Sequence, residues 1–212
     1  MVTTLIEVVL FRKGKTVMVS VMELAAQITT DLQEPVKYLP YGILFGSICI
    51  FILEFIHIYH KRKPDRKHIF LFFLLVTYLT VLMFQAFFSR ESGSRTGVEL
   101  YPFSILGISI GEDASFVENI LMFLPFGVLV PFTFRFLRSG FYCVGLAFIG
   151  SVSLEILQLI TGRGYCQVDD VISNTAGAFL GWLFTAVWFA IRRRNEEKVY
   201  AVRSFTMYQF SR

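Results

Sequence analysis

Charged side chains are scarce in this chain of 212 residues, and their scarcity excludes an ordinary soluble domain. Lys, Arg, Asp and Glu make up 17% of the residues, whereas hydrophobic residues make up 55% and phenylalanine alone occurs 24 times. Several apolar runs reach the roughly 20 residues that a helix needs to cross about 30 Å of hydrocarbon. We therefore expect an all-α integral membrane protein, a bundle of transmembrane helices.

Cysteine is equally sparse, with three residues in the whole chain: Cys49, Cys143 and Cys166. Their spacing fits neither a metal site nor a disulfide framework. Their expected depths in the membrane also differ, so no two of them should meet. We predict three free thiols, no bound metal and no cofactor.

Two further features are missing from the sequence. The basic residues lie beside apolar segments and form no stripe of their own, which argues against a nucleic-acid partner. The first basic cluster, Arg12, Lys13 and Lys15, follows the first apolar run instead of preceding it. That order is the reverse of a signal peptide, so we expect no cleaved leader.

Five segments are long and apolar enough to span a membrane. We place them at about 38–59, 68–88, 115–137, 141–161 and 171–191. The third should begin at Ser115, because Ser115 and Glu118 have the spacing of a capping box. The fourth should end at Gly162, a residue typical of helix C-termini.

The distribution of Lys and Arg predicts the orientation of these spans. Clusters occur in the loop after the first span, at Arg135 and Arg138, and at 192–194 after the fifth. With five spans all of these clusters fall on one side, which the positive-inside rule assigns to the cytoplasm. We expect the C-terminus in the cytoplasm and the loop at 162–170 outside.

Residues 1–35 form a separate N-terminal segment before the bundle of residues 36–212. Val17 to Ile28 is apolar enough to be helical but contains Glu23 and Gln27 and is short for a span. We expect an interfacial helix lying on the membrane surface. A sixth, short span is the alternative.

The longest polar segment, residues 89–115, is rich in Gly and Ser but is interrupted by apolar residues such as Val98, Tyr101 and Phe103. A disordered linker lacks such residues. We expect this loop to fold back onto the mouth of the bundle.

The candidate site lies around SVSLEILQLITGRGYCQVDDVISNTAGAFLG, residues 151–181. Ser151, Glu155 and Gln158 share one helix face. A carboxylic acid inside an apolar span is costly and marks a functional site. From helix positions we expect a polar chamber, open to the outside, made of one set of residues: Asn119, Glu155, Gln158, Arg163, Asp169, Asp170 and Asn174.

Simpler structural roles compete for most of these residues. Asp169 or Asp170 fits the N-cap of the fifth helix. Arg163 fits an ion pair with one of these aspartates, and the two asparagines fit hydrogen bonds between helices. Glu155 is the residue that such roles explain least, so it is also the candidate catalytic group. Gly177 and Gly181 form a small-xxx-small packing face.

Three separated motifs resemble the VanZ-like membrane proteins. They are ENILMFLPFGVLVP, SVSLEILQLITGRG and VDDVISNTAGAFLG, preceded by SRESGSRTGVELYPFSILG, and together they cover about residues 70–190. The matching positions are Asn119, Pro125, Gly127, Pro131, Glu155, Gln158, Arg163, Asp170, Asn174 and Gly177. One departure is Gln167, where the family often has an acidic residue.

The resemblance implies a multi-pass protein of the bacterial cytoplasmic membrane, associated with the cell envelope and with resistance to teicoplanin-type lipoglycopeptides. We expect it to bind membrane lipids and an amphiphile in the chamber, either a lipid-linked cell-wall precursor or a lipid-tailed antibiotic. Arg163 would then be the partner of a phosphate. The alternatives are a membrane enzyme with Glu155 as general acid or base, and a small proton-coupled transporter.

Overall fold

The computed structural model describes the backbone of residues 7–12, 15–61, 63, 65–88, 93, 97–103 and 106–210, and within these ranges the side chains from residue 21 to residue 200. Among these residues, five helical segments are long and apolar enough to cross a membrane: 21–59, 66–88, 110–133, 140–161 and 168–200. The all-α membrane bundle predicted from the sequence is confirmed.

Three helices form the core of the bundle. They are α4 (Ile110–Thr133), α5 (Gly140–Thr161) and α6 (Val168–Phe210). Their buried apolar residues form one cluster with two residues of α3 (Arg66–Met83) and one of the short helix η3 (Arg135–Arg138). The cluster is made of Leu75, Leu82, Phe123, Phe126, Val130, Leu137, Cys143, Ala147 and Ala178.

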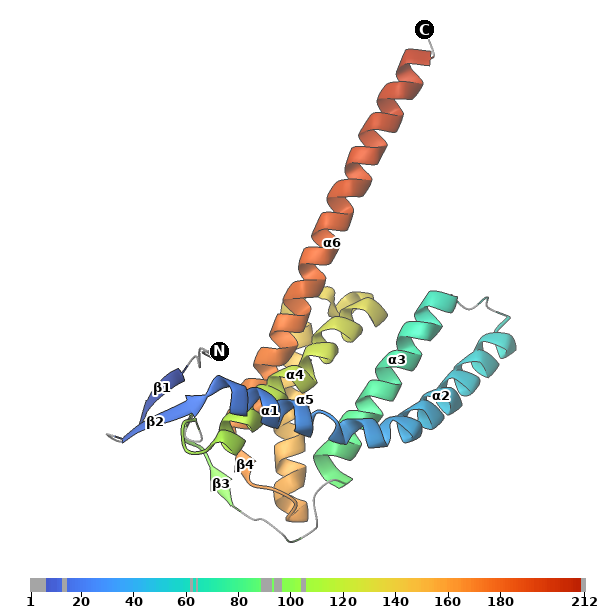
Figure 1. Cartoon of the computed structure of the whole chain (residues 1–212). Coiled ribbons are helices and arrows are strands. Elements are labelled where there is room, and N and C mark those ends of the chain that lie inside the picture. Colours follow the sequence, from blue (N-terminus) through green and yellow to red (C-terminus); the bar gives the residue numbers. More distant parts are fainter. Residues whose placement is uncertain are drawn as a thin grey trace.

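The remaining long helix, α2 (Leu39–Tyr59), packs on α3 as a hairpin beside this core (Figure 1). Its two buried residues are Gly42 and Gly46, and both face Thr77 of α3. Thr77 donates from its hydroxyl to the carbonyl of Gly42 at 3.3 Å. Small residues at a helix contact allow two backbones to approach closely, which explains how a mostly exposed helix holds its place.

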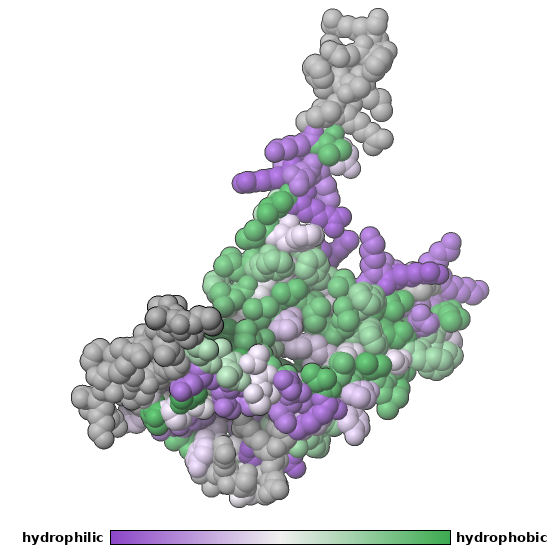
Figure 2. Space-filling model, viewed as in Figure 1, coloured by the Kyte–Doolittle hydropathy of each residue, from purple (hydrophilic) through white to green (hydrophobic). Residues whose placement is uncertain are grey.

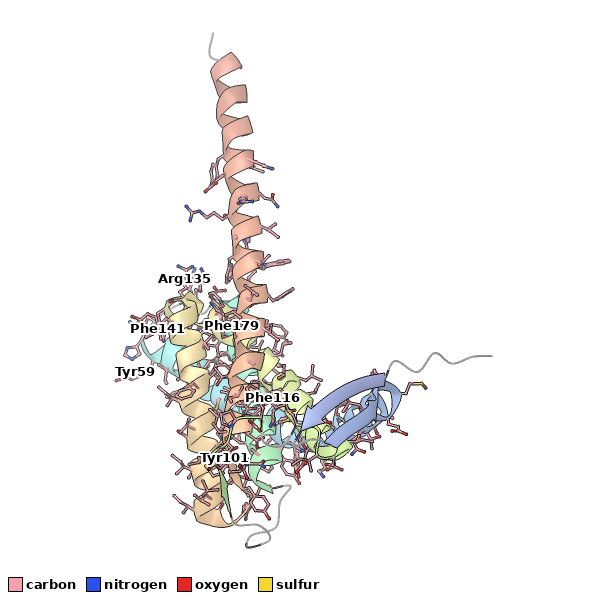
Figure 3. All side chains as sticks on the ribbon, turned by 90° about the vertical axis from the view of Figure 1, so that its left-hand side faces the viewer. Tyr59, Tyr101, Phe116, Arg135, Phe141 and Phe179 are labelled. Atoms are coloured by element: carbon pink, nitrogen blue, oxygen red, sulfur yellow. The ribbon has the colours of Figure 1, made fainter. Side chains whose placement is uncertain are left out.

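The ends of these helices are as different in composition as the sequence predicted. Basic residues of the α2–α3 loop, of η3 (Arg135–Arg138) and of α6 after Ile191 lie at one end, here called the basic end. Figure 2 shows a hydrophobic band between this end and a second hydrophilic region, here called the polar end. In Figure 3, Arg135 and Phe141 lie at the basic end and Tyr101 at the polar end.

The polar end is closed by two loops that pair with each other. Strand β3 (Val98–Glu99) runs parallel to β4 (Cys166–Gln167). The amide of Cys166 donates to the carbonyl of Gly97 at 2.9 Å, and that of Gly93 donates to the carbonyl of Gly162 at the same distance. The expectation that the 89–115 loop folds back onto the bundle mouth is therefore confirmed for its described residues 93, 97–103 and 106–109; residues 89–92, 94–96 and 104–105 lie outside the described part.

The start of α4 differs from the prediction. Its N-cap is Ser109, whose hydroxyl accepts from the amide of Glu112 at 3.2 Å, so the helix begins at Ile110 and not at Ser115. Ser109 and Glu112 have the same capping-box spacing as Ser115 and Glu118. Because the helix starts earlier, Asn119 lies in its third turn and not in its first.

The N-terminal segment was predicted only in part. Residues 15–20 form strand β2 (Lys15–Ser20), which pairs antiparallel with β1 (Glu7–Arg12), so the predicted helix start at Val17 is wrong. Alternating valines at 17, 19 and 21 favour a strand, and this signal outweighed the apolar composition. Helix α1 (Val21–Asp31) then follows and lies across α4 (Figure 1). One face of α1, with Leu24, Ile28 and Asp31, is partly covered.

Helix α6 continues well beyond the predicted end at Ile191. Two ion pairs support the continuation, from Arg192 to Glu196 at 3.0 Å and from Arg193 to Glu197 at 3.1 Å. Both have the i, i+4 spacing that stabilises an exposed helix by about 0.2–0.5 kcal/mol per pair. The basic cluster therefore ends the apolar part of the helix and not the helix itself.

Candidate functional site

A cavity of about 300 Å³ lies at the polar end, between α3, α4, α5 and α6. We call it the chamber. Five of the seven predicted site residues line it: Asn119, Glu155, Gln158, Asp170 and Asn174. Arg163 and Asp169 are not among the described residues of its wall.

Glu155 is placed in the wall by the face of α5 that the sequence predicted. Ser151 is 0% exposed, Glu155 3% and Gln158 4%, so the whole i, i+4, i+7 stripe is buried. The carboxylate of Glu155 accepts from the backbone amide of Gln167 at 2.9 Å. It thus connects α5 to β4, and Gln167 contributes its backbone to this contact.

Amide side chains join the helices around the chamber in two separate pairs. Asn119 of α4 donates to the carboxylate of Asp170 in α6 at 2.9 Å. One turn further along α6, Asn174 donates to the hydroxyl of Ser151 in α5 at 2.8 Å. Both asparagines therefore do hydrogen-bond between helices, as in the simpler interpretation, and both also face the cavity.

Gln158 and Arg163 hold the end of α3. The last residues of this helix form the π-helix η2 (Phe84–Phe88), whose carbonyls lack their usual partners within the helix. Gln158 donates to the carbonyl of Ala86 at 3.0 Å, and Arg163 donates to that of Phe87 at 2.6 Å. The Arg163 guanidinium also lies 5.7 Å from the centre of the Phe88 ring.

The predicted ion pair between Arg163 and an aspartate of the 162–170 loop is wrong. The ion pairs among the described residues do not include one between Arg163 and Asp169 or Asp170. Asp169, 1% exposed, instead accepts from the backbone amide of Phe103 in the folded-back loop. Helix α6 begins at Val168, so neither aspartate is its N-cap; both lie in its first turn.

An acidic face of α4 was not predicted from the sequence. Glu112, Ser115 and Glu118 line the chamber together with Asn119. Their spacing puts them on one side of a helix, a signal that was present in the sequence. It was overlooked because the helix start was placed at Ser115, which left Glu112 in a loop.

Within the part of the chain that the structure describes, oxygens of three wall residues are buried without a hydrogen-bond partner. They are Oε1 of Glu118, Oε1 of Gln158 and Oδ1 of Asn174. Buried polar atoms of native proteins are nearly always paired, with protein or with something bound. Among the described residues no group of three or more His, Cys, Asp or Glu side chains is arranged to hold a metal ion.

Cys166 lies in the loop beside the chamber, and the pKa of its thiol depends on the charges there. Burial, and then the charges of Glu155 and Asp170, raise the pKa of Cys166 above its ordinary value. Since the thiolate is the reactive form, labelling by a membrane-impermeant maleimide should be slow at neutral pH and should accelerate as the pH rises through the raised pKa. We expect this in whole cells carrying a Cys49→Ser variant.

Cys143 serves as the internal control for this measurement. It is 0% exposed in the core at the basic end, so it should stay unlabelled in intact cells. Labelling of an Arg193→Cys variant, at an exposed position of the basic end, together with protection of Cys166 would show that the polar end faces the cytoplasm.

Double-mutant cycles should separate the contacts of Asp170 from those of Arg163. Asn119→Ala and Asp170→Ala remove the two ends of one hydrogen bond, so their effects on the free energy of unfolding should deviate from additivity by about 1 kcal/mol. Arg163→Met and Asp170→Ala should add within about 0.5 kcal/mol, because the two side chains have different partners. Thermal melts in detergent give both numbers, and a strong Arg163–Asp170 coupling would contradict the structure.

Comparisons with known proteins agree on one family. A family model described as VanZ/LLP1 matches residues 69–189. The Protein VanZ of Enterococcus faecium is 29% identical over 116 residues, which cover 51% of this chain and 68% of that relative. No solved structure gives a significant match. The matched region begins in α3 and ends in α6, so it contains the chamber but not α1 or α2.

Proposed function

Because the chain belongs to the VanZ/LLP1 family, we propose that it is a bacterial envelope protein whose chamber binds the head group of a lipid-linked or lipid-tailed amphiphile. The observation that carries the proposal is the chamber itself, a polar cavity around a buried carboxylate in an apolar bundle. Carboxylates inside apolar spans are retained where they have a function, since each is costly to bury.

The wall of the chamber suits a molecule with two kinds of surface. Leu82, Met122, Phe123 and Leu154 supply apolar wall next to the amides and carboxyls. A cavity of about 300 Å³ is at the lower end of the range of roughly 300–1,000 Å³ for small-molecule sites. It holds a head group, and an acyl chain would have to lie against the apolar exterior of the bundle.

The clustering of basic residues supports an orientation with the polar end outside and the C-terminus in the cytoplasm. Arg135, Arg138, Arg192 and Arg193 line one pocket at the basic end, so the clusters that were separate in sequence are together in space. Positively charged ends of membrane proteins stay in the cytoplasm. In the cytoplasmic membrane the chamber would then face the outer leaflet, where lipid-linked wall precursors and lipoglycopeptides meet.

Two measurements test the proposed function. Native mass spectrometry of the purified full chain should detect a retained lipid that is lost in Glu155→Gln. Expression in a teicoplanin-sensitive bacterium should change the inhibitory concentration of teicoplanin, and Glu155→Gln should abolish the change. Absence of any chamber-dependent lipid, together with unchanged susceptibility, would overturn the proposal. Recovery of a chemically altered lipid would instead favour the enzymatic alternative.

A further inference from the structure

The unpartnered oxygens of the chamber identify the chemistry of its occupant. Gln158 is 4% exposed and Asn174 6%, and one oxygen of each has no donor. Glu118 of the opposite helix α4 is only half-buried and its carboxyl lies beside Asp31, but its Oε1 is also buried without a donor. An acceptor buried without a donor is destabilising, so three on one small cavity indicate that something in it donates hydrogen bonds.

The contacts of the two amides show that their oxygens, and not their nitrogens, are left for a ligand. Gln158 uses its Nε2 on the carbonyl of Ala86, which can only accept. Asn174 uses its Nδ2 on the hydroxyl of Ser151. Because a hydroxyl can also donate, only the Gln158 amide is fixed by its contact. Both residues line the chamber, and the carbonyl oxygen of each has no donor among the described residues.

The charges of the described wall point in the same direction. The wall includes the carboxyls of Glu112 and Glu118 and, among the described residues, no Lys, Arg or His. A phosphate offers only acceptors of its own and would meet acceptors on the wall. Arg163, the phosphate partner expected from the sequence, donates to the carbonyl of Phe87 and is not among the described residues of the wall.

We propose that the head group bound in the chamber is recognised as a hydrogen-bond donor, through hydroxyl or amine hydrogens, and not through a phosphate. This inference rests on the proposed function and adds the chemical class of the ligand. Gln158, Asn174 and Glu118 accept from the head group.

A graded set of lipids with the same acyl chains tests the donor requirement. Phosphatidylethanolamine, its N-methyl and N,N-dimethyl derivatives and phosphatidylcholine keep the same charges while losing the N–H donors one by one. Glucosyl diacylglycerol supplies hydroxyl donors without a phosphate. The measurement is lipid binding to the purified full chain by native mass spectrometry.

We expect phosphatidylethanolamine or glucosyl diacylglycerol to bind about ten-fold more tightly than phosphatidylcholine, the size of effect that one or two unmade hydrogen bonds produce. Preference for phosphatidylethanolamine identifies an amine as the donor in the head group, and preference for glucosyl diacylglycerol identifies sugar hydroxyls as the donors. Equal binding of phosphatidylcholine and both donor lipids overturns the inference and leaves the proposed function standing.

Matched variants tie the preference to the chamber. Asn174→Leu and Glu118→Met each replace a side chain that carries an unpartnered oxygen by an apolar one of similar shape, and Asn174→Leu also loses the hydrogen bond to Ser151. Each should reduce the preference for donor lipids about five-fold. Thr175→Val is the control, because its hydroxyl is also buried and unpartnered but does not line the chamber. If both chamber variants lose binding of donor lipids and of phosphatidylcholine to the same extent, Asn174 and Glu118 have only a structural role. Lipid binding that none of these variants changes would overturn the proposed function as well.

Discussion

Alanine at Gly177 is expected to destabilise the bundle strongly. A Cβ on Gly177 would overlap the backbone carbonyl of Ile120 in α4, and one on Gly127 would overlap the carbonyl of Ala178 in α6. Backbone atoms cannot rotate away as a side chain can. The two helices would have to separate along their whole contact, which also carries Phe123, Phe126 and Ala178 of the core.

The expected loss is about 3 kcal/mol or more, at the upper end for an overpacked core. For a chain of this size that corresponds to a fall of about 6–12 °C in melting temperature. Gly150→Ala on α5 is the matched control, because no atom lies within 4 Å of the methyl position. It should be neutral or slightly stabilising, since alanine favours a helix over glycine by about 0.5–1 kcal/mol. Similar losses in both variants would mean that α4 and α6 do not meet at Gly177.

Glu155→Gln should abolish chamber function while leaving the fold intact. The glutamine oxygen can still accept from the amide of Gln167, so the connection between α5 and β4 survives. The bond becomes weaker without the negative charge, by about 1 kcal/mol. We expect a fall in melting temperature of no more than about 4 °C, normal expression and a complete loss of any effect on teicoplanin susceptibility.

Glu155→Leu is the comparison variant that measures how much the hydrogen bond of Glu155 contributes to stability. It leaves the amide of Gln167 without this acceptor, which should cost about 1–3 kcal/mol and visibly lower the melting temperature. A glutamine variant as unstable as the leucine variant would show that the carboxylate is required for folding. A glutamine variant with full activity would show that Glu155 only joins α5 to β4.

Much of the local structure followed from the sequence because it depends on short-range rules. The span boundaries of α2, of α3 together with η2, and of α5 lie within about two residues of those predicted, because hydrocarbon thickness and helix rise set their length. Gly162, with a φ of 63°, ends α5 as predicted. The local errors came from competing signals of equal strength, such as the two capping-box spacings at Ser109 and Ser115.

The sequence by itself determined that this protein is a membrane bundle. It also determined which face of α5 is buried and that Glu155 belongs to a polar site. These features follow from helix periodicity and from the cost of burying a charge, both of which act within one segment. Only the tertiary structure decided which residues contact one another: Arg163 contacts η2, Asp169 contacts Phe103, and Asn119 contacts Asp170. Those pairings join residues 51–76 positions apart. They depend on how helices pack against one another, and the close contact of Gly127 and Gly177 with facing backbones sets that distance and register.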